Sequence, residues 1–172
     1  HNSLGADFYA YLATRSGVCN AGSGYTLFIQ RGATRRITNQ DEVVQALRRR
    51  FELPVVVVRL EKLTVQEQMA VACGARVVLG VQGMGLEWAH FMNGGSSSGL
   101  LIEVYWNGWP PYYKSAMRTS GIWGENVQAT PMGLAHPKLD NVTVNATYIE
   151  GIHWPGNRMR SRRPNAFRGM DE

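Results

Sequence analysis

Three glycines follow a short apolar run near the middle of the chain and offer the clearest chemistry in the sequence. The run Val77 to Leu79 passes through Gly80, Gly83 and Gly85 into apolar residues at helical spacing. This pattern predicts a buried strand, a glycine turn and a helix. Amides at the start of a helix have no partner within it, so the N–H groups of residues 83–85 are expected to bind an anion such as a phosphate. Glycines at such turns also serve packing alone, and the spacing matches neither GxGxxG nor a P-loop.

Arginines gather in three places that call for different interpretations. Arg31, Arg35 and Arg36 follow a predicted strand, so they could meet an anion or lie on the surface as solvated charges. Residues 48–50 end a predicted helix, where positive charge suits the helix dipole and needs no ligand. The third group predicts an exposed and largely irregular basic tail over residues 151–172. It consists of Arg158, Arg160, Arg162, Arg163 and Arg168.

Composition sets broad limits on the function. The 172 residues carry a net charge of +5, and their 44% apolar content is that of one ordinary globular domain. The basic balance permits nucleic acid, acidic membranes or small phosphorylated ligands as partners. No apolar run approaches the roughly 18 residues of a membrane span, so no membrane segment is expected within the chain. The chain has only two cysteines, Cys19 and Cys73, which are too few for a disulfide framework or a zinc site. A single disulfide between them is possible, and the redox compartment is not decided by them.

The elements that must position these groups alternate between helix and strand. Capping signals open two of the helices, with Asn39 and Glu42 before the first and Thr64 and Glu67 before the second. The continuous run after Pro54 predicts a strand covered on both sides. Helices are expected at 4–16, 40–50, 65–73, behind the glycine turn and near 113–120. Strands are expected at 25–30, 55–60, 77–79, 100–105, 126–130 and, by strict alternation, 141–148.

This alternation predicts an α/β fold, a Rossmann-like parallel sheet with helices on both faces. Ligands of such sheets gather at the carboxyl ends of the strands. The loop RGATRR, the turn GVQGMG and the residues after Glu103 are therefore expected to converge. We expect residues 1–135 to form this domain, residues 136–150 to add an appended strand, and residues 151–172 to form the tail.

The order of these segments resembles the carboxyl-terminal half of family 61 glycosyltransferases over about residues 5–120. That family includes plant β-1,2-xylosyltransferases and arabinosyltransferases, and animal N-acetylglucosaminyltransferases that modify proteins in the secretory pathway. Its pattern combines an R…R…N segment, an EQ-containing helix, a GxHGAGL turn followed by a phenylalanine, and a strand that carries Glu. The matching residues are Arg31, Arg36, Asn39, Glu67, Gln68, Gly80, Gly83, Gly85, Leu86, Phe91 and Glu103.

The resemblance implies one half of a GT-B type enzyme, in which this half binds a UDP-sugar. The reaction would be an inverting transfer to a hydroxyl of a glycan or glycoprotein acceptor. It would need no cofactor, and the absence of a DxD pair gives no reason to expect a metal. Glu103 is expected to accept hydrogen bonds from ribose hydroxyls, and the general base stays unnamed. The expected substrate-binding residues are Arg31, Arg36, Asn39, Gln82, Gly83, Met84, Gly85, Glu103 and Tyr113.

The turn departs from the family pattern at four positions. Gln82 replaces the usual His, Met84 replaces Ala, and Glu87 and Trp88 replace a polar residue and Asn. Glutamine can donate to a phosphate oxygen but cannot shuttle a proton, so donor binding tolerates the change better than catalysis does. His90, behind the turn, is interpreted as a hydrogen-bonded interior residue.

Two other functions stay open at this stage. One is a catalytically inactive module that binds a nucleotide sugar. The other is a basic nucleic-acid-binding domain led by the arginine tail, which we rank last because no aromatic residues are interleaved with the arginines. Asn141 and Asn145 each begin an N-glycosylation triplet, which favours the lumen of the secretory pathway, in the Golgi or endoplasmic reticulum.

Overall fold

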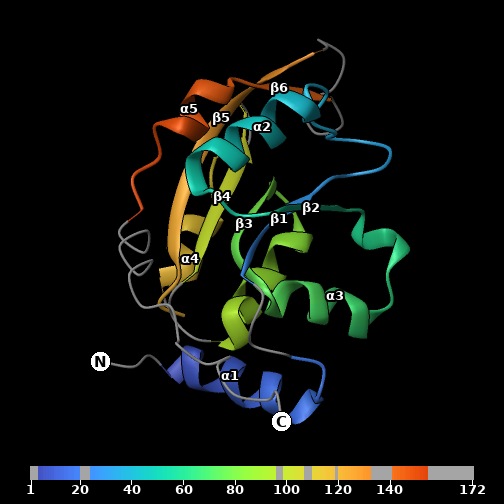
Figure 1. Ribbon diagram of the computed structural model, residues 1–172, viewed down its shortest axis with the longest axis vertical. Helices are drawn as coiled ribbons and strands as arrows, with labels where there is room; N and C mark the ends of the chain where they lie inside the picture. Colours follow the sequence, from blue (N-terminus) through green and yellow to red (C-terminus); the bar gives the residue numbers. More distant parts are fainter. Residues whose placement is uncertain are drawn as a thin grey trace, which may run out of the picture.

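A six-stranded sheet forms the centre of the described part of the chain (Figure 1). The computed structural model describes residues 4–19, 24–95, 99–106, 110–118, 120–132 and 141–154. The strands are β1 (Tyr25–Ile29), β2 (Val55–Val58), β3 (Ala75–Val81), β4 (Leu100–Tyr105), β5 (Trp123–Pro131) and β6 (Val142–Val144). The helices are α1 (Leu4–Ser16), α2 (Gln40–Phe51), α3 (Val65–Cys73), α4 (Tyr113–Arg118), α5 (Ala146–Glu150) and the 3-10 helices η1 (Leu60–Lys62) and η2 (Met84–Gly95).

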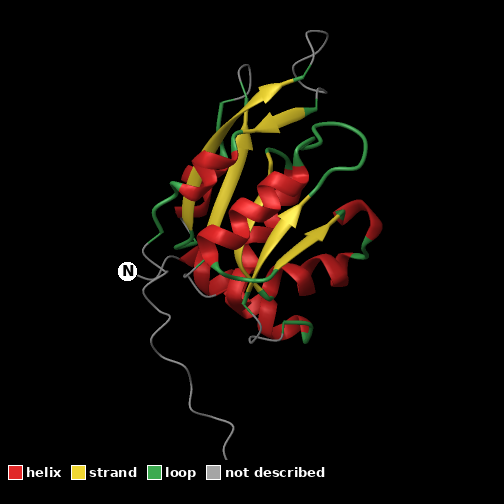
Figure 2. Ribbon diagram, turned by 45° about the horizontal axis from the view of Figure 1, so that its top comes forward, coloured by secondary structure: helices red, strands yellow, loops and turns green. Residues whose placement is uncertain are grey.

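The strands follow the spatial order β2-β1-β3-β4-β5-β6. Every pairing from β2 to β5 is parallel, and β6 alone among the six runs antiparallel to its neighbour β5. The predicted fold class is confirmed, because helices cover both faces of a mostly parallel sheet (Figure 2). The carboxyl ends of β1, β3 and β4 consequently lie next to one another at one rim.

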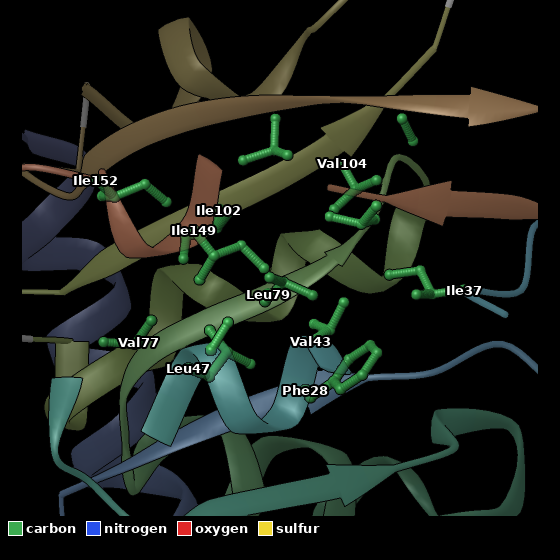
Figure 3. Close-up of a cluster of buried hydrophobic side chains, with 14 of the residues drawn as sticks. Phe28, Ile37, Val43, Leu47, Val77, Leu79, Ile102, Val104, Ile149 and Ile152 are labelled. Carbon is green, nitrogen blue, oxygen red and sulfur yellow. The ribbon is translucent and has the colours of Figure 1, made fainter. Parts of the chain in front are cut away.

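One face of the sheet packs against α2 and α5. Figure 3 shows Val43 and Leu47 of α2 pointing toward Phe28 and Leu79 of the sheet. These side chains are fully buried because α2 places its apolar residues on one side. The buried members of this face include Phe28, Val43, Leu47, Phe51, Val77, Leu79, Ile102, Val104, Trp106 and Ile149.

The opposite face packs against η2 and α4. Leu86 and Met92 of η2 and Met117 of α4 are buried there against strand residues such as Leu101. The helices α1 and α3 lie outside η2, at the end of the molecule away from α2 and α5 in Figure 1. A disulfide between Cys19 and Cys73 joins the segment after α1 to the end of α3, with Cα atoms 5.3 Å apart. The bridge that the sequence left open is therefore present.

The capping box at Thr64 is confirmed, but the cap predicted at Asn39 is absent. The Thr64 side chain accepts from the Glu67 N–H, and the Glu67 carboxylate accepts from the Thr64 N–H. Asn39 makes no side-chain cap at the start of α2. Its side chain bonds instead to Val144, accepting from the N–H at 3.0 Å and donating to the carbonyl at 2.7 Å. Asn39 therefore joins α2 to β6.

Two strand predictions were wrong in instructive ways. The run Val55–Val58 was expected to be covered on both sides, but β2 lies at the edge of the sheet, where Val56 and Val57 are exposed. The alternating segment 141–148 is a strand only over Val142–Val144. Asn145 ends it, because its side-chain oxygen accepts from the Thr147 N–H and starts α5. The structure describes the predicted basic tail, residues 151–172, only as far as residue 154. The rest of the tail, with all of its arginines, lies outside the described residues.

Candidate functional site

The glycine turn connects the end of β3 to the start of η2. The Gln82 N–H donates to the Val104 carbonyl at 2.9 Å, which holds the end of β3 against β4. The Leu86 N–H then donates to the Gly83 carbonyl, also at 2.9 Å, as η2 begins. Met84 and Gly85 are the central residues of this turn, and their amides stand at the position where helix starts bind anions.

The glycines of the turn serve two different purposes. A Cβ at Gly83 would lie 2.8 Å from Nη1 of Arg31, and the residue has a φ of +157°. A side chain at this position would therefore displace the guanidinium. A Cβ at Gly80 would instead lie 2.8 Å from Leu86, so that glycine serves core packing. The packing interpretation of the turn holds for Gly80, whereas Gly83 makes room for a cation.

Two arginines from the loop after β1 lie over the turn. A Cβ at Gly83 would lie 3.6 Å from Nη1 of Arg35, in addition to its 2.8 Å approach to Nη1 of Arg31. Both guanidinium groups therefore lie next to Gly83. Arg35 also donates to the Gln82 carbonyl at 3.0 Å. The pKa of Arg35 is lowered by burial and then by the positive charge of Arg31. Two positive charges are therefore held close together.

Arg36 lies elsewhere, so Arg35 occupies the place expected for it. The Arg36 N–H donates to the Asn141 side chain at 3.1 Å, and its carbonyl accepts from Val142 at 2.9 Å. These bonds tie its main chain to the β6 segment, and Arg36 is absent from the pocket described below. The reason is local: Arg35 has a left-handed φ of 56°, which turns the chain between the two side chains.

A pocket of about 470 Å³ lies between the arginine loop, η1 and the glycine turn. It is bounded by the carboxyl end of β1 and the start of η2, which is the rim where a ligand was expected. Met84 lines it with a side chain that is 76% exposed. The lining residues are Ile29, Gln30, Arg31, Gly32, Ala33, Thr34, Arg35, Leu60, Glu61, Met84 and Gly85.

Gln82 is buried beside the turn and does not extend toward the pocket. Its Nε2 donates to the Pro110 carbonyl at 2.7 Å. Its Oε1 is buried without a hydrogen-bond partner among the described residues. The amide group predicted to donate to a phosphate is therefore used to hold the segment before α4.

Glu103 of β4 is fully buried, and its carboxylate lies at the start of α4. It is on the other side of β3 from the loop that carries Arg31 and Arg35. Its carboxylate accepts from the Tyr112 N–H at 3.0 and 3.1 Å and from the Tyr113 N–H at 2.8 Å. This is how an acidic residue stabilises a helix start. The ribose-binding role of Glu103 stays a prediction, and the contacts give it a different role, which is to fix the position of Tyr113.

A polar cluster that the sequence did not identify surrounds the Tyr113 hydroxyl. Burial, together with the nearby negative charges of Glu87 and Glu103, raises the pKa of Tyr113 to about 12. His90 Nε2 lies 3.4 Å from a Glu87 oxygen, and His90 Nδ1 lies 2.7 Å from the Ser120 hydroxyl. Burial lowers the pKa of His90, opposed by Glu87. The available signal was the i, i+3 spacing of Glu87 and His90, which places both on one side of a helix.

A carboxylate accepts but cannot donate, so the proton of neutral His90 is assigned to Nε2. Nδ1 then accepts from Ser120. The interior interpretation of His90 agrees with its 6% exposure and with its stacking on Tyr9, whose ring centroid lies 4.3 Å away. Glu87 differs from its partners because about 40% of its side chain is exposed.

Comparison with family models decides the relationship. The model described as Glycosyltransferase 61 matches residues 6–98, more than half of the chain. The chain belongs to glycosyltransferase family 61. The matched span contains the arginine loop, the glycine turn, Glu87 and His90, and it ends before Glu103 and Tyr113. A comparison with curated proteins found no match. Family membership makes the protein a glycosyltransferase by relationship, with a sugar donor and an acceptor as its substrates.

Two further observations concern the described residues only. None of the helices there combines the length and the apolar character needed to cross a membrane. No group of three or more histidine, cysteine or acidic side chains in this part of the chain is arranged to hold a metal ion.

Proposed function

We propose that this chain binds the diphosphate of a UDP-sugar and supports inverting transfer of the sugar to an acceptor hydroxyl. The observation that carries the proposal is the pair of guanidinium groups held over Gly83. Two like charges close together are unfavourable in the free protein, and a bound diphosphate would relieve their repulsion. Met84 and Gly85 line the same pocket, and their amides would add donors for the phosphate oxygens.

The same groups suit the chemistry of the reaction. Negative charge grows on the diphosphate as the bond to the sugar breaks, and donors that are already in place stabilise that charge. Arg31 and Arg35 supply charge without a metal ion, and the Glu103 contacts fix α4 beside the turn. In this proposal Arg35 takes the role that the family pattern suggested for Arg36.

A titration of the protein with UDP by calorimetry tests the proposal. The parent should bind UDP, and Arg31→Ala with Arg35→Ala should weaken binding about 100-fold, because each charged hydrogen bond is worth roughly 1.5 kcal/mol or more. The double variant Arg48→Ala with Arg49→Ala is the matched control, since it also removes two positive charges, but from exposed positions on α2. The proposal fails if the parent does not bind UDP or if both double variants lose affinity equally. A protein that binds UDP and transfers nothing is the inactive module.

We also propose that the protein resides in the lumen of the secretory pathway, in the Golgi or endoplasmic reticulum. The Cys19–Cys73 disulfide suits an oxidising compartment. Asn145 is exposed and Asn141 is partly exposed, so both triplets lie where an oligosaccharide has room. Protein from a eukaryotic secretory host should show the disulfide and N-glycans by peptide mass spectrometry before and after deglycosylation. Free thiols with unmodified asparagines would contradict the placement.

A further inference from the structure

We propose that Glu87 is the general base that takes the proton from the acceptor hydroxyl. The inference rests on the proposed function and adds the group that the sequence left unnamed. Glu87 lies in the first turn of η2, three residues after Met84, which lines the arginine pocket. Because a 3-10 helix has three residues per turn, Glu87 lies one turn from that pocket, on the side of η2 that carries Met84.

Exposure separates the two carboxylates beside Tyr113. Glu103 is fully buried and is used by the amides at the start of α4. Glu87 has about 40% of its side chain exposed, so an acceptor hydroxyl can approach it. A general base must come within hydrogen-bond distance of the proton that it removes. Of these two groups, only Glu87 is exposed enough for an acceptor to come that close.

Glu87 is also surrounded by groups from three elements. His90, from the next turn of η2, lies 3.4 Å from a Glu87 oxygen, and Tyr9 of α1 is stacked on the His90 ring. Burial and the nearby charge of Glu87 raise the pKa of Tyr113 of α4 to about 12, so its hydroxyl is protonated at neutral pH and can donate to the carboxylate. Burial, aided by the charge of Glu87, also raises the pKa of Tyr9. Positioning of this kind keeps a base in its reactive geometry.

The step balances without any further reactant. The acceptor oxygen forms a bond to the anomeric carbon while the bond from that carbon to the diphosphate oxygen breaks. The bonding pair leaves with UDP, and the acceptor proton passes to a Glu87 carboxylate oxygen. Tyr113 and His90 are positioning residues, because they act through Glu87.

Glu61 is the competing carboxylate, since it is exposed and lines the arginine pocket. It comes from η1, between β2 and α3, and it lies against Gly32. Glu61 lies beside the arginines of the pocket, and no tyrosine or histidine contact to it is seen within the described residues. We therefore assign the base to Glu87 and use Glu61 as the rival in the test.

Release of UDP from UDP-xylose, UDP-arabinose and UDP-N-acetylglucosamine in water tests the assignment, because water is also an acceptor that must lose a proton. Glu87→Gln should slow release at least about 100-fold, the lower range for loss of a general base. Its affinity for UDP should stay within about twofold of the parent. Glu52→Gln, an exposed change at the end of α2, is the matched control and should behave as the parent does.

Azide gives a readout that a structural role of Glu87 would not produce. Azide is already an anion, so its attack on the anomeric carbon needs no base. Glu87→Ala with azide should therefore release UDP at a rate near that of the parent, with glycosyl azide as the product. Tyr113→Phe should be slowed about tenfold and should not need azide for residual activity.

Each outcome has a separate meaning. If the parent does not bind UDP, the proposed function fails. If the parent binds UDP but Glu87→Gln releases UDP at the parent rate, the function survives and Glu87 is not the base. The assignment is also overturned if Glu61→Gln is slow and rescued by azide, or if the parent binds UDP but releases it from none of the donors with or without azide.

Discussion

The two sides of the Gly83 turn carry different charged groups and are held in different ways. On the arginine side, Arg31 and Arg35 come from the loop after β1 and lie in an open pocket. On the carboxylate side, Glu87 contacts Tyr113, which follows β4, and His90. On the arginine side burial and the charge of Arg31 lower the pKa of Arg35, whereas on the carboxylate side Glu87 lies 3.4 Å from a His90 nitrogen. In the proposed function the first side binds the diphosphate and the second takes the acceptor proton.

The largest expected effect comes from breaking the support of the carboxylate side. Glu103→Gln should lower the free energy of unfolding by about 2–3 kcal/mol, because an amide donor would face the buried amides of Tyr112 and Tyr113. Chemical denaturation measures this loss. Glu125→Gln on β5 is the control and should cost less than about 1 kcal/mol, since its contact to Trp123 is exposed. Equal effects of the two changes would show that Glu103 does not hold α4.

Gly83→Ala should strike the arginine side alone. The added Cβ would displace the Arg31 guanidinium, so UDP affinity should fall about tenfold, or ~1.4 kcal/mol. Gly17→Ala is a suitable control: that glycine also has a positive φ, but a Cβ there would meet nothing within 4 Å. It should destabilise the protein slightly and leave UDP binding unchanged. Calorimetry would contradict the division of the site if Gly83→Ala bound UDP as the parent does.

Glu61→Gln sharpens the description of the arginine side. The Glu61 carboxylate lines the pocket that holds Arg31 and Arg35. Removing an exposed negative charge near a diphosphate should tighten UDP binding about twofold at low salt, and added salt should reduce the gain. Weaker binding would mean that Glu61 contacts the ligand directly, for example at the ribose hydroxyls.

The smallest effect concerns pH on the carboxylate side. Because burial lowers the pKa of His90 below 6.5, the unfolded chain binds more protons than the folded one in mild acid. The stability contributed by neutral His90 is complete above pH 6.5 and is lost as pH falls through its folded pKa. His90→Gln should therefore flatten the fall in unfolding free energy between pH 7 and pH 5. His153→Gln changes an exposed histidine and should leave that slope as it is.

The sequence predicted the parallel sheet because most of its strands are short apolar runs bounded by helix signals. The Thr64 cap was predicted for the same reason, since capping depends on neighbours in the chain. The position of β2 was not predictable in this way: Val55–Val58 has the composition of a central strand, but its place at the edge depends on which strands surround it.

The site divides along the same line. Gly83 and Arg31 were chosen from local pattern and lie together. Arg35 was passed over in favour of Arg36, because the left-handed turn that separates them leaves no mark in the residue types. Glu87 was noted only as a departure from the family pattern: its i, i+3 spacing to His90 was a local signal, but Tyr113 lies more than twenty residues further along the chain.

The disulfide has a practical consequence for anyone who makes this protein. It closes a loop that spans 54 residues of sequence separation, which by chain entropy alone is worth about 4 kcal/mol. It also secures α1, whose Tyr9 covers the His90 ring. Material produced in a reducing cytosol would be free to lose that cover and admit water beside Glu87. If a preparation binds UDP normally but turns over slowly, its free thiols should therefore be measured before the slow turnover is attributed to a substitution.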